Sequence, residues 1–374
     1  MRTVGVPREI KTDEHRVAIT PDGVHEMVSH GVAVVVESGA GDDSSITDDD
    51  YRAVGAEIAN DAEAVWGRAG IVLKVKEPQP SEFAFMRRDL TLFTYLHLAA
   101  YPDVADALLA AGTAAIAYET VQLESGALPL LAPMSEIAGR MAPQVGAHFL
   151  ERRPGGRGIL MGGAPGVRPA RVVVLGAGNV GWNAAWIAQG MEAEVLLLDK
   201  NLDRLRWVDQ IHRGRIMTLA SNTAAVARAV ADADLVIGAV LVPGSRAPQL
   251  VTEAMIRTMK PRTVIIDCAI DQGGCIEGIR ETTHSDPVYE RFGVLHYAVG
   301  NVPGAVANTS TYALTNATLP YAVELATRGV RDAVEADPAL ASGVNTLAGE
   351  VPNAAVAHAL NRDPVALAGL WSRS

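Results

Sequence analysis

Short apolar runs alternate with amphipathic stretches along the first third of the chain. Runs typical of strands cover residues 3–6, 33–36, 70–76, 90–96 and 113–118. Between them lie patterns typical of short helices, the clearest at 21–30 and 103–111. Strands and helices that alternate in this way predict a parallel sheet, because parallel neighbours are joined by crossover connections.

A second series begins after a predicted helix over 134–152 and a loop rich in Gly, Pro and Arg. Its apolar runs lie at 172–175, 195–198, 216–219, 235–241, 263–270 and 294–299. From about residue 305 the pattern is mainly helical. The predicted fold class is α/β, with two doubly wound Rossmann-like domains. The nucleotide-binding domain, 130–307, is inserted into a discontinuous domain formed by 1–129 and 308–374.

The most specific pattern lies at 171–199. A strand-like run ends in G-A-G-N-V-G, and an alanine-rich helical segment and a second apolar run follow. Gly176 would form the tight turn, and Gly178 would let the backbone approach a pyrophosphate. Gly181 would let the helix pack close to the strand, with its N-terminal N–H groups facing the phosphates. Glycines alone can mark an ordinary turn, but with these flanking elements they indicate a dinucleotide site.

The acid that closes this stretch bears on the choice of dinucleotide. Asp199 lies roughly 20 residues beyond the glycines, where a carboxylate accepts both ribose hydroxyls and repels a 2′-phosphate. The pattern therefore favours NAD over NADP. The adjacent Lys200 points weakly the other way, although a solvated lysine is the simpler interpretation.

Composition narrows the partners and the setting. The chain has 374 residues, 49% of them hydrophobic and 20% charged, with a formal net charge of −11. These values suit about two domains and disfavour nucleic acid or an anionic membrane as partner. No apolar run approaches the ~18 residues of a membrane span, and the first residues lack the apolar core of a signal peptide. The two cysteines form neither a disulfide framework nor a metal motif, so we expect a cytoplasmic protein without a metal.

Several polar residues stand at the carboxyl ends of predicted strands, where functional groups gather in open α/β sheets. Lys76 and His97 occupy such ends in the first series, and Asp271 and Asn301 do so in the second. Each has an ordinary alternative as a solvated, structural or turn-forming residue. Arg16 lies in a polar loop, and its spacing alone favours a surface arginine.

Ten stretches together resemble the NAD-dependent alanine dehydrogenases. They are EHRVAITP, LKVKEP, FTYLHLAA, AYETVQ, LPLLAPMSEIAGR, GGRGILMGG, VVVLGAGNVG, DLVIGAVLVPG, VIIDCAIDQGGC and TSTYALTNATLPY. The likeness runs in the same order to about residue 330 and weakens over the last 40 or so residues. The same superfamily contains the nucleotide-binding subunit of proton-translocating transhydrogenase, which lacks the LKVKEP-to-FTYLH pairing in this form.

The resemblance implies roles residue by residue. Arg16 would bind the substrate carboxylate, and Lys76 would contact that carboxylate and the keto oxygen. His97 would be the acid/base group, and Asp271 would support proton transfer at the reacting carbon. Tyr95 and Asn301 would line the same cleft. The matching cofactor positions are Ser135, Gly176, Gly178, Val180, Gly181, Asp199, Ser221, Val240 and Leu241. Members of the family are typically homohexamers.

The chemistry of these residue types agrees with those roles. A guanidinium can hold a carboxylate through two hydrogen bonds, and a lysine stabilises charge that develops on a carbonyl oxygen. A histidine, whose unperturbed pKa is about 6.5, shuttles protons near neutral pH. No metal is required, because the nicotinamide takes the electrons. The predicted reaction is the reversible NAD-dependent oxidative deamination of L-alanine to pyruvate and ammonium.

Three other functions stay open on sequence alone. The chain could be the nucleotide-binding subunit of a transhydrogenase, which works with a membrane partner. It could oxidise another small amino acid, because one methylene in a pocket is worth only ~1–3 kcal/mol. It could also be an NAD-dependent binding module without turnover.

Overall fold

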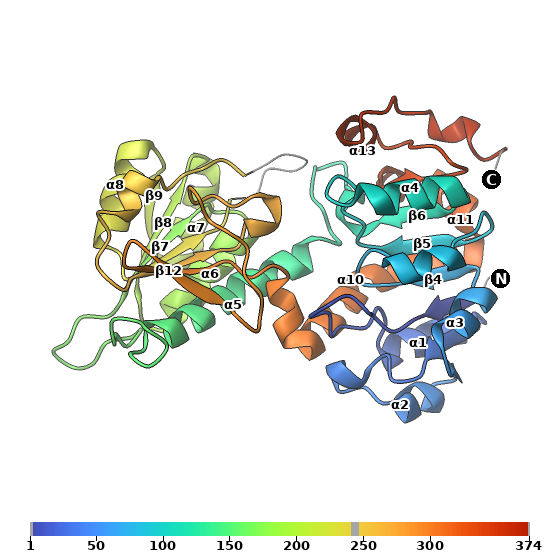
Figure 1. Ribbon diagram of the computed structural model, residues 1–374, viewed down its shortest axis with the longest axis horizontal. Helices are drawn as coiled ribbons and strands as arrows, with labels where there is room; N and C mark the ends of the chain where they lie inside the picture. The colour runs from blue at the N-terminus through green and yellow to red at the C-terminus, as the bar shows by residue number, and fades with distance from the viewer. Residues whose placement is uncertain (1–2, 241–246, 373–374) are drawn as a thin grey trace. The chain divides into compact units, whose positions relative to one another are not determined.

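The computed structural model describes residues 3–240 and 247–372. The chain divides into two compact units, each built around its own sheet (Figure 1). Unit 1 consists of Met1–Met134 and Val306–Ser374, and unit 2 of Ser135–Ala305. Among the described residues, no helix combines the length and apolar character that crossing a bilayer requires.

Unit 1 contains a seven-stranded sheet in the order β14-β6-β5-β4-β1-β2-β3. The strands are β1 (Val4–Val6), β2 (Val34–Glu37), β3 (Glu57–Ala59), β4 (Ile71–Leu73), β5 (Thr91–Thr94), β6 (Ala114–Ala117) and β14 (Val344–Thr346). All neighbours are parallel except β14, which runs antiparallel to β6. Because β1, β4 and β5 are adjacent and parallel, the segments that follow them leave the sheet at one edge.

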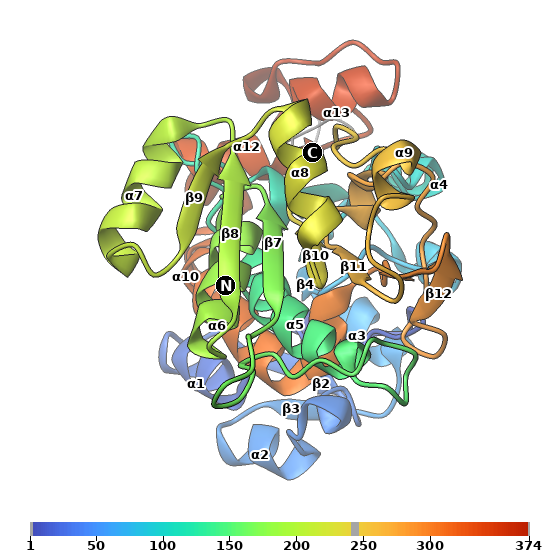
Figure 2. The same cartoon turned by 90° about the vertical axis from the view of Figure 1, so that its left-hand side faces the viewer.

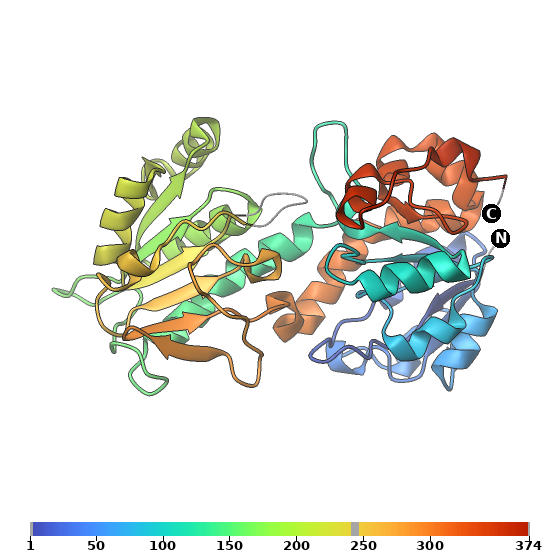
Figure 3. The ribbon, with the colours of Figure 1, turned by 45° about the horizontal axis from the view of Figure 1, so that its top comes forward.

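Helices cover both faces of this sheet. They are α1 (Pro21–Ser29), α2 (Asp48–Ala53), α3 (Ala62–Arg68), α4 (Pro102–Ala111), α10 (Ala307–Arg328), α11 (Val330–Ala336), α12 (Pro338–Gly343) and α13 (Ala354–Ala359). Local capping explains several starts: the side chains of Thr20, Thr47 and Asp61 each accept a backbone N–H of the helix that follows. The helix α13, drawn in red in Figure 3, lies beside α4, and Val356 shares a buried cluster with Leu108.

Unit 2 contains the second seven-stranded sheet, in the order β12-β13-β11-β10-β7-β8-β9. Its strands are β7 (Arg171–Leu175), β8 (Glu194–Asp199), β9 (Met217–Ala220), β10 (Leu235–Gly238), β11 (Val264–Asp267), β12 (Val288–Arg291) and β13 (Val294–Tyr297). Among these described strands, only β12 is antiparallel to its neighbour. Figure 2 faces this sheet and shows β9, β8, β7 and β10 in sequence across it.

The helices of unit 2 are α6 (Asn179–Gly190), α7 (Leu202–His212), α8 (Thr223–Asp232) and α9 (Glu253–Ile256), together with most of α5 (Ala132–Leu150). The long α5 packs closely against α6. The absence of a side chain at Gly139 permits this, since a Cβ there would overlap the carbonyl of Val180. Pro143 is accommodated inside α5, as the sequence pattern predicts.

The doubly wound α/β fold class is confirmed, with three strands that the pattern does not predict. β14 lies in the stretch predicted to be mainly helical, and β3 and β12 lie where the pattern predicts no strand. Each has only three or four residues, too few to show a period of two. The apolar run at 263–270 also ends earlier than predicted: β11 stops at Asp267, and Asp271 lies on the short 3₁₀ turn η4 (Ile270–Gln272).

Candidate functional site

Four of the predicted site residues lie in unit 1, at the edge where β1, β4 and β5 end. Arg16 belongs to the loop after β1, Lys76 follows β4, and Tyr95 and His97 follow β5. These strands are neighbours, so their carboxyl ends meet at the same edge. The sheet thus explains why residues far apart in sequence share one region.

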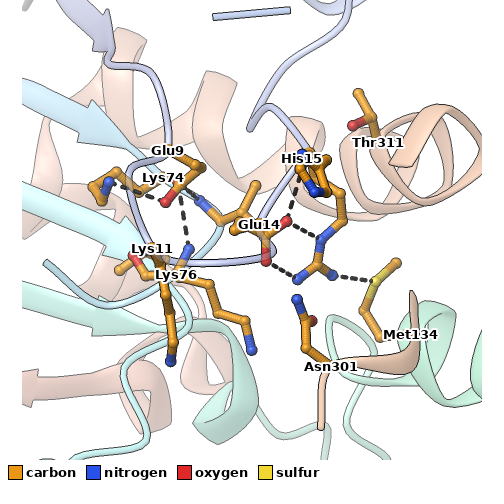
Figure 4. Close-up of polar contacts among 12 residues, drawn as sticks. Glu9, Lys11, Glu14, His15, Lys74, Lys76, Met134, Asn301 and Thr311 are labelled. Carbon is orange, nitrogen blue, oxygen red and sulfur yellow. Dashed lines mark hydrogen bonds and ion pairs between the residues drawn. The ribbon is translucent and has the colours of Figure 1, made fainter. Parts of the chain in front are cut away.

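Arg16 is a buried residue with a carboxylate partner, which corrects the surface position that its spacing favours. Its side chain is 2% exposed, and Glu14 accepts its Nε at 2.6 Å and its Nη2 at 2.5 Å (Figure 4). The Sδ atom of Met134 lies 2.9 Å from Nη1. This fork fixes the plane of the guanidinium.

The ion pair changes the acidity of Glu14. Burial alone would raise the pKa of its carboxyl, but the Arg16 charge and hydrogen bonds, helped by Lys76, lower that pKa to about 2. Arg16 in turn has a raised pKa, because Glu14 outweighs the cost of burying its charge. Both groups are therefore charged throughout the physiological range.

A second buried network surrounds the residues before Lys76. The Lys74 ammonium is 0% exposed and donates to Glu9 at 3.1 Å and to Glu82 at 3.0 Å. The other oxygen of Glu9 accepts the backbone N–H of Val75 at 2.5 Å and that of Lys76 at 3.4 Å. The segment that leaves β4 is thus held by a side chain from the loop after β1, and Lys76 is fixed at its base.

Burial raises the pKa of a carboxyl group and lowers that of an ammonium group, and ion pairing opposes both effects. Burial raises the pKa of Glu9, an effect that Lys74 only partly offsets. Lys74 has a raised pKa because its two carboxylates outweigh burial. A third lysine, Lys11, donates to the buried Glu77 at 2.5 Å and to the Tyr101 hydroxyl at 3.1 Å.

His97 stands where β5 has ended, in an unusual backbone conformation with φ +48°. Its backbone N–H donates to the Glu119 carboxylate at 2.6 Å, and its ring Nδ1 lies 3.8 Å from the same carboxylate. The ring of Tyr95 stacks on the imidazole, with centroids 5.8 Å apart and planes at 2°. The Tyr95 hydroxyl donates to the carbonyl of Leu130 at 2.5 Å, and burial raises its pKa.

The loop that carries Arg16 is tied to the C-terminal part of unit 1. The Thr311 hydroxyl, on α10, accepts the N–H of Val17 at 3.1 Å and lies 2.9 Å from the hydroxyl of Ser44. Ser44 also donates to the carbonyl of His15, and Asn308 donates to the carbonyl of Ser44. Residues from two distant segments, Ser44 and the first turns of α10, therefore set the position of this loop.

In unit 2, the glycine-rich turn has the geometry that its motif predicts. Gly176 has φ +104°, and a Cβ there would lie 2.6 Å from the carbonyl oxygen of Ala239. A Cβ on Gly181 would overlap the carbonyl oxygen of Gly176, so α6 packs directly on the turn. Around Gly178 the nearest described atom to such a Cβ is 3.9 Å away, so no described side chain covers this backbone against a ligand.

Asp199 has a second contact that the sequence pattern does not predict. Its carboxylate accepts the N–H of Ala177 at 2.6 Å and that of Asn201 at 2.7 Å. It thus links the end of β8 to the glycine turn. A carboxylate oxygen can accept more than one hydrogen bond, so the same group also suits ribose hydroxyls.

The remaining predicted cofactor residues border this turn or lie on neighbouring segments of unit 2. Val180 is in the first turn of α6, and the side chain of Val240 would meet a Cβ on Gly176. Ser221 follows β9, and its N–H donates to the carbonyl of Asp199 at 2.9 Å. Ser135 is half-buried in the first turn of α5. Leu241 lies outside the described residues.

Asp271 is exposed on η4, whereas the carboxylate that ends β11 is Asp267. A Cβ on Gly300 would lie 3.3 Å from Asp271 Oδ1, so this side chain faces the end of β13. Asp267 is 1% exposed and accepts the N–H groups of Ala269 and Cys275, which brackets the turn that carries Asp271. Asn301 has φ +57°, and its carbonyl accepts the N–H of Gly304 at 2.9 Å.

The donor set of unit 2 fits a dinucleotide. Within the described part of the chain, no side chain caps the backbone N–H groups of α6 at Gly178. Residues Gly176 to Val180 would hold the pyrophosphate, and Asp199 would hold the adenosine ribose. Within the described residues, no cluster of three His, Cys, Asp or Glu side chains has the geometry of a metal site.

Comparisons with known proteins agree with both units. The Alanine dehydrogenase/PNT N-terminal domain matches residues 5–138, and the C-terminal domain of the same name matches residues 142–354. The alanine dehydrogenase of Methanococcus maripaludis is 56% identical over 357 residues, which cover 95% of this chain and 96% of that protein. The chain therefore belongs to the alanine dehydrogenase/PNT family, as its sequence motifs predict.

Solved structures support the same assignment. An L-alanine dehydrogenase matches with a TM-score of 0.93 and 49% identity, over 96% of this chain and 99% of that chain. A transhydrogenase from Sinorhizobium meliloti matches with a TM-score of 0.81 and 27% identity, over 93% and 99%. Family membership together with the Rossmann-type unit implies a nicotinamide cofactor.

The sequence pattern does not predict the glutamates that accept hydrogen bonds from Arg16, Lys76 and His97. Glu14, Glu9 and Glu119 all contact predicted site residues, yet none was singled out. Glu14 stands two residues before Arg16 in EHR, and Glu119 lies in the quoted AYETVQ stretch. Their signal was present in those motifs, but an acidic residue in a loop is usually solvated, so burial could not be inferred.

Proposed function

We propose that the protein is an NAD-dependent L-alanine dehydrogenase. It would convert L-alanine, NAD⁺ and water to pyruvate, ammonium, NADH and a proton, and run the reverse reaction. The observation that carries the proposal is the grouping of Arg16, Lys76 and His97 at one edge of unit 1, behind adjacent strands. The relatives named alanine dehydrogenase, at over half identity along nearly the whole chain, support it.

The residues of unit 1 would supply binding and proton transfer. Arg16, held flat by Glu14, would bind the substrate carboxylate and fix the direction of the Cα–H bond. Lys76 would contact the carboxylate and stabilise charge on the oxygen of the carbinolamine and keto acid. His97 would take the proton from the attacking water and return it in the reverse direction, with Tyr95 packed on its ring.

Unit 2 would bind the dinucleotide, whose nicotinamide accepts or donates the hydride when bound. The proposed domains are 1–129 with 308–374 for substrate and 130–307 for cofactor. Gly176, Gly178, Val180, Gly181 and Asp199 would contact it, as would Ser135, Ser221, Val240 and Leu241. Asp271 would support proton transfer, and Asn301 would line the cleft. Asp199 would select NAD over NADP because its carboxylate repels a 2′-phosphate. By family resemblance, we also propose a cytoplasmic homohexamer.

The decisive experiment follows NADH absorbance with pyruvate and ammonium, leaving out one component at a time. We expect oxidation only when all three reactants are present, and much less with NADPH. A screen of glycine, serine, 2-aminobutyrate and alanine in the forward direction tests the choice of substrate. No turnover with any amino acid, together with hydride exchange between NADH and a nucleotide analogue, would instead favour a transhydrogenase subunit.

The His97→Ala variant tests the assigned acid/base group. We expect kcat to fall by about 10²–10⁴-fold because proton transfer loses its side chain. NADH should still bind, as measured by fluorescence titration, because the cofactor contacts lie in unit 2. Unchanged kcat would remove His97 from the mechanism.

A further inference from the structure

Glu119 holds the backbone of the segment that carries His97. It lies on the 3₁₀ turn η3 (Tyr118–Thr120) that follows β6, and β6 pairs in parallel with β5, with Ala117 opposite Thr94. This register places Glu119 beside the residues that leave β5. Its carboxylate accepts the N–H of His97 at 2.6 Å and that of Leu96 at 3.2 Å.

These hydrogen bonds are important because the backbone of His97 is in the left-handed region, with φ +48°. Non-glycine residues are strained there and persist only where the surroundings impose that conformation. Glu119 fixes the N–H groups on the amino side of His97. The His97 carbonyl is fixed as well, because it accepts the N–H groups of Ala100 at 2.8 Å and Tyr101 at 3.3 Å.

The same carboxylate also faces the ring. Glu119 Oε1 lies 3.8 Å from His97 Nδ1; the Glu119 side chain is 13% exposed and that of His97 39%, so water screens the contact only in part. Tyr95 stacks parallel to the imidazole and restricts rotation of its plane. A carboxylate beside one ring nitrogen favours a proton on that nitrogen and leaves the other as the acceptor.

We propose that Glu119 is a positioning residue for the reaction of this enzyme. It keeps His97 in the left-handed conformation and keeps the ring proton on Nδ1, so that Nε2 is the atom that exchanges protons with the substrate. This inference rests on the proposed function, because it assumes that His97 is the acid/base group. The contrasting possibility is that Glu119 only stabilises the loop.

Two substitutions separate the backbone contacts from the charge. Glu119→Ala removes both, and we expect kcat to fall by about 100-fold, the upper end of the loss when a carboxylate that orients a metal-bound histidine is removed. Glu119→Gln keeps an oxygen that accepts the backbone N–H groups, and we expect a smaller loss of about 10-fold. KM for NADH should stay within about twofold for both, because the cofactor contacts lie elsewhere. The matched control is the exposed Glu124→Ala, which removes the same charge from the same segment.

A double-mutant cycle tests whether Glu119 acts through His97. In a His97→Ala background, Glu119→Ala should lower the remaining kcat by less than about twofold, since groups that act as a unit are not additive. A loop-stabilising role predicts the same proportional loss in both backgrounds, and that result would overturn the proposal. So would a kcat of Glu119→Ala equal to that of the wild type.

A readout that needs no turnover keeps this test distinct from that of the function. Nitrogen NMR of protein labelled at its histidine rings reports which nitrogen carries the proton, and His97→Asn identifies the signals of His97. We expect the Nδ1–H form in the wild type and a shift toward the Nε2–H form in Glu119→Ala. If alanine is not a substrate but this shift appears, the proposed function fails while the positioning by Glu119 stands. An Nε2–H form in the wild type would overturn the positioning.

Discussion

The two units share one architecture but build their functional edges from different materials. Each is a seven-stranded sheet, parallel except for one antiparallel edge strand. In unit 2 the edge is shaped by glycines and offers backbone N–H groups, with Asp199 linking β8 to the turn. In unit 1 the edge is formed by charged side chains, and buried glutamates hold the cations.

The difference shows what each kind of ligand demands. A pyrophosphate can be held by main-chain N–H groups, so unit 2 needs conformations rather than charges. A small carboxylate substrate offers few atoms, so unit 1 needs cations fixed in direction. Fixing a cation inside a sheet edge requires a buried counter-charge, because an unpaired buried ion is costly.

The largest expected effect tests the backbone side of this comparison. Gly181→Ala would force a Cβ into the carbonyl of Gly176, and we expect loss of cofactor binding and more than about 4 kcal/mol of stability. Gly178→Ala has room for its Cβ among the described residues, so stability should change by less than about 1 kcal/mol while cofactor affinity falls. Thermal unfolding and NADH titration measure the two quantities. Full affinity in Gly178→Ala would show that the ligand does not approach this turn.

The next effect tests the side-chain edge. Arg16→Met leaves the Glu14 carboxylate buried without its main counter-charge, and we expect a loss of about 3–5 kcal/mol in the free energy of unfolding. The control is Arg52→Met on α2, whose partner Asp49 is 91% exposed, and where the loss should stay below about 1 kcal/mol. Urea denaturation followed by circular dichroism compares them. Equal losses would mean that burial of the pair is unimportant.

A smaller effect is expected from pH. The pKa of Glu14 is lowered to about 2 from an ordinary 4.5, so its stabilisation is present above the unfolded pKa and disappears as pH falls toward 2. The lowered pKa corresponds to a stabilisation of the folded state on the order of 3 kcal/mol. The free energy of unfolding of the wild type should therefore fall between about pH 5 and pH 2. Glu14→Gln should show a shallower fall, and an unchanged slope would contradict the assignment.

The same contrast explains what could be predicted from sequence. Gly176, Gly178, Gly181 and Asp199 form a local motif whose spacing encodes its own geometry, and the structure has that geometry. The side-chain edge joins residues that are far apart, such as Lys74 and Glu9, so no local pattern carries it. Lys76 and His97 were found because strand ends can be predicted.

The carboxylate partners of these residues depend on how neighbouring strands are paired, and the hydrophobic pattern does not predict that register. Glu119 reaches His97 only because Ala117 lies opposite Thr94 in the paired strands. The short strands β3, β12 and β14 were missed for a related reason, since their pairing comes from neighbours rather than from their own residues. Asp271 was predicted at the end of a strand over 263–270, but it lies on η4, because the apolar run continues past the point where β11 ends.

The placement of β14 has a consequence for how the chain matures on the ribosome. All strands of unit 2 have been synthesised by residue 297, whereas β6 must wait for β14, at Val344–Thr346, to cover its outer edge. Thr311 likewise reaches the Arg16 loop only after the whole of unit 2 has been made. Domains generally fold as units while translation proceeds. The half of the protein that begins first is therefore the one that is finished last.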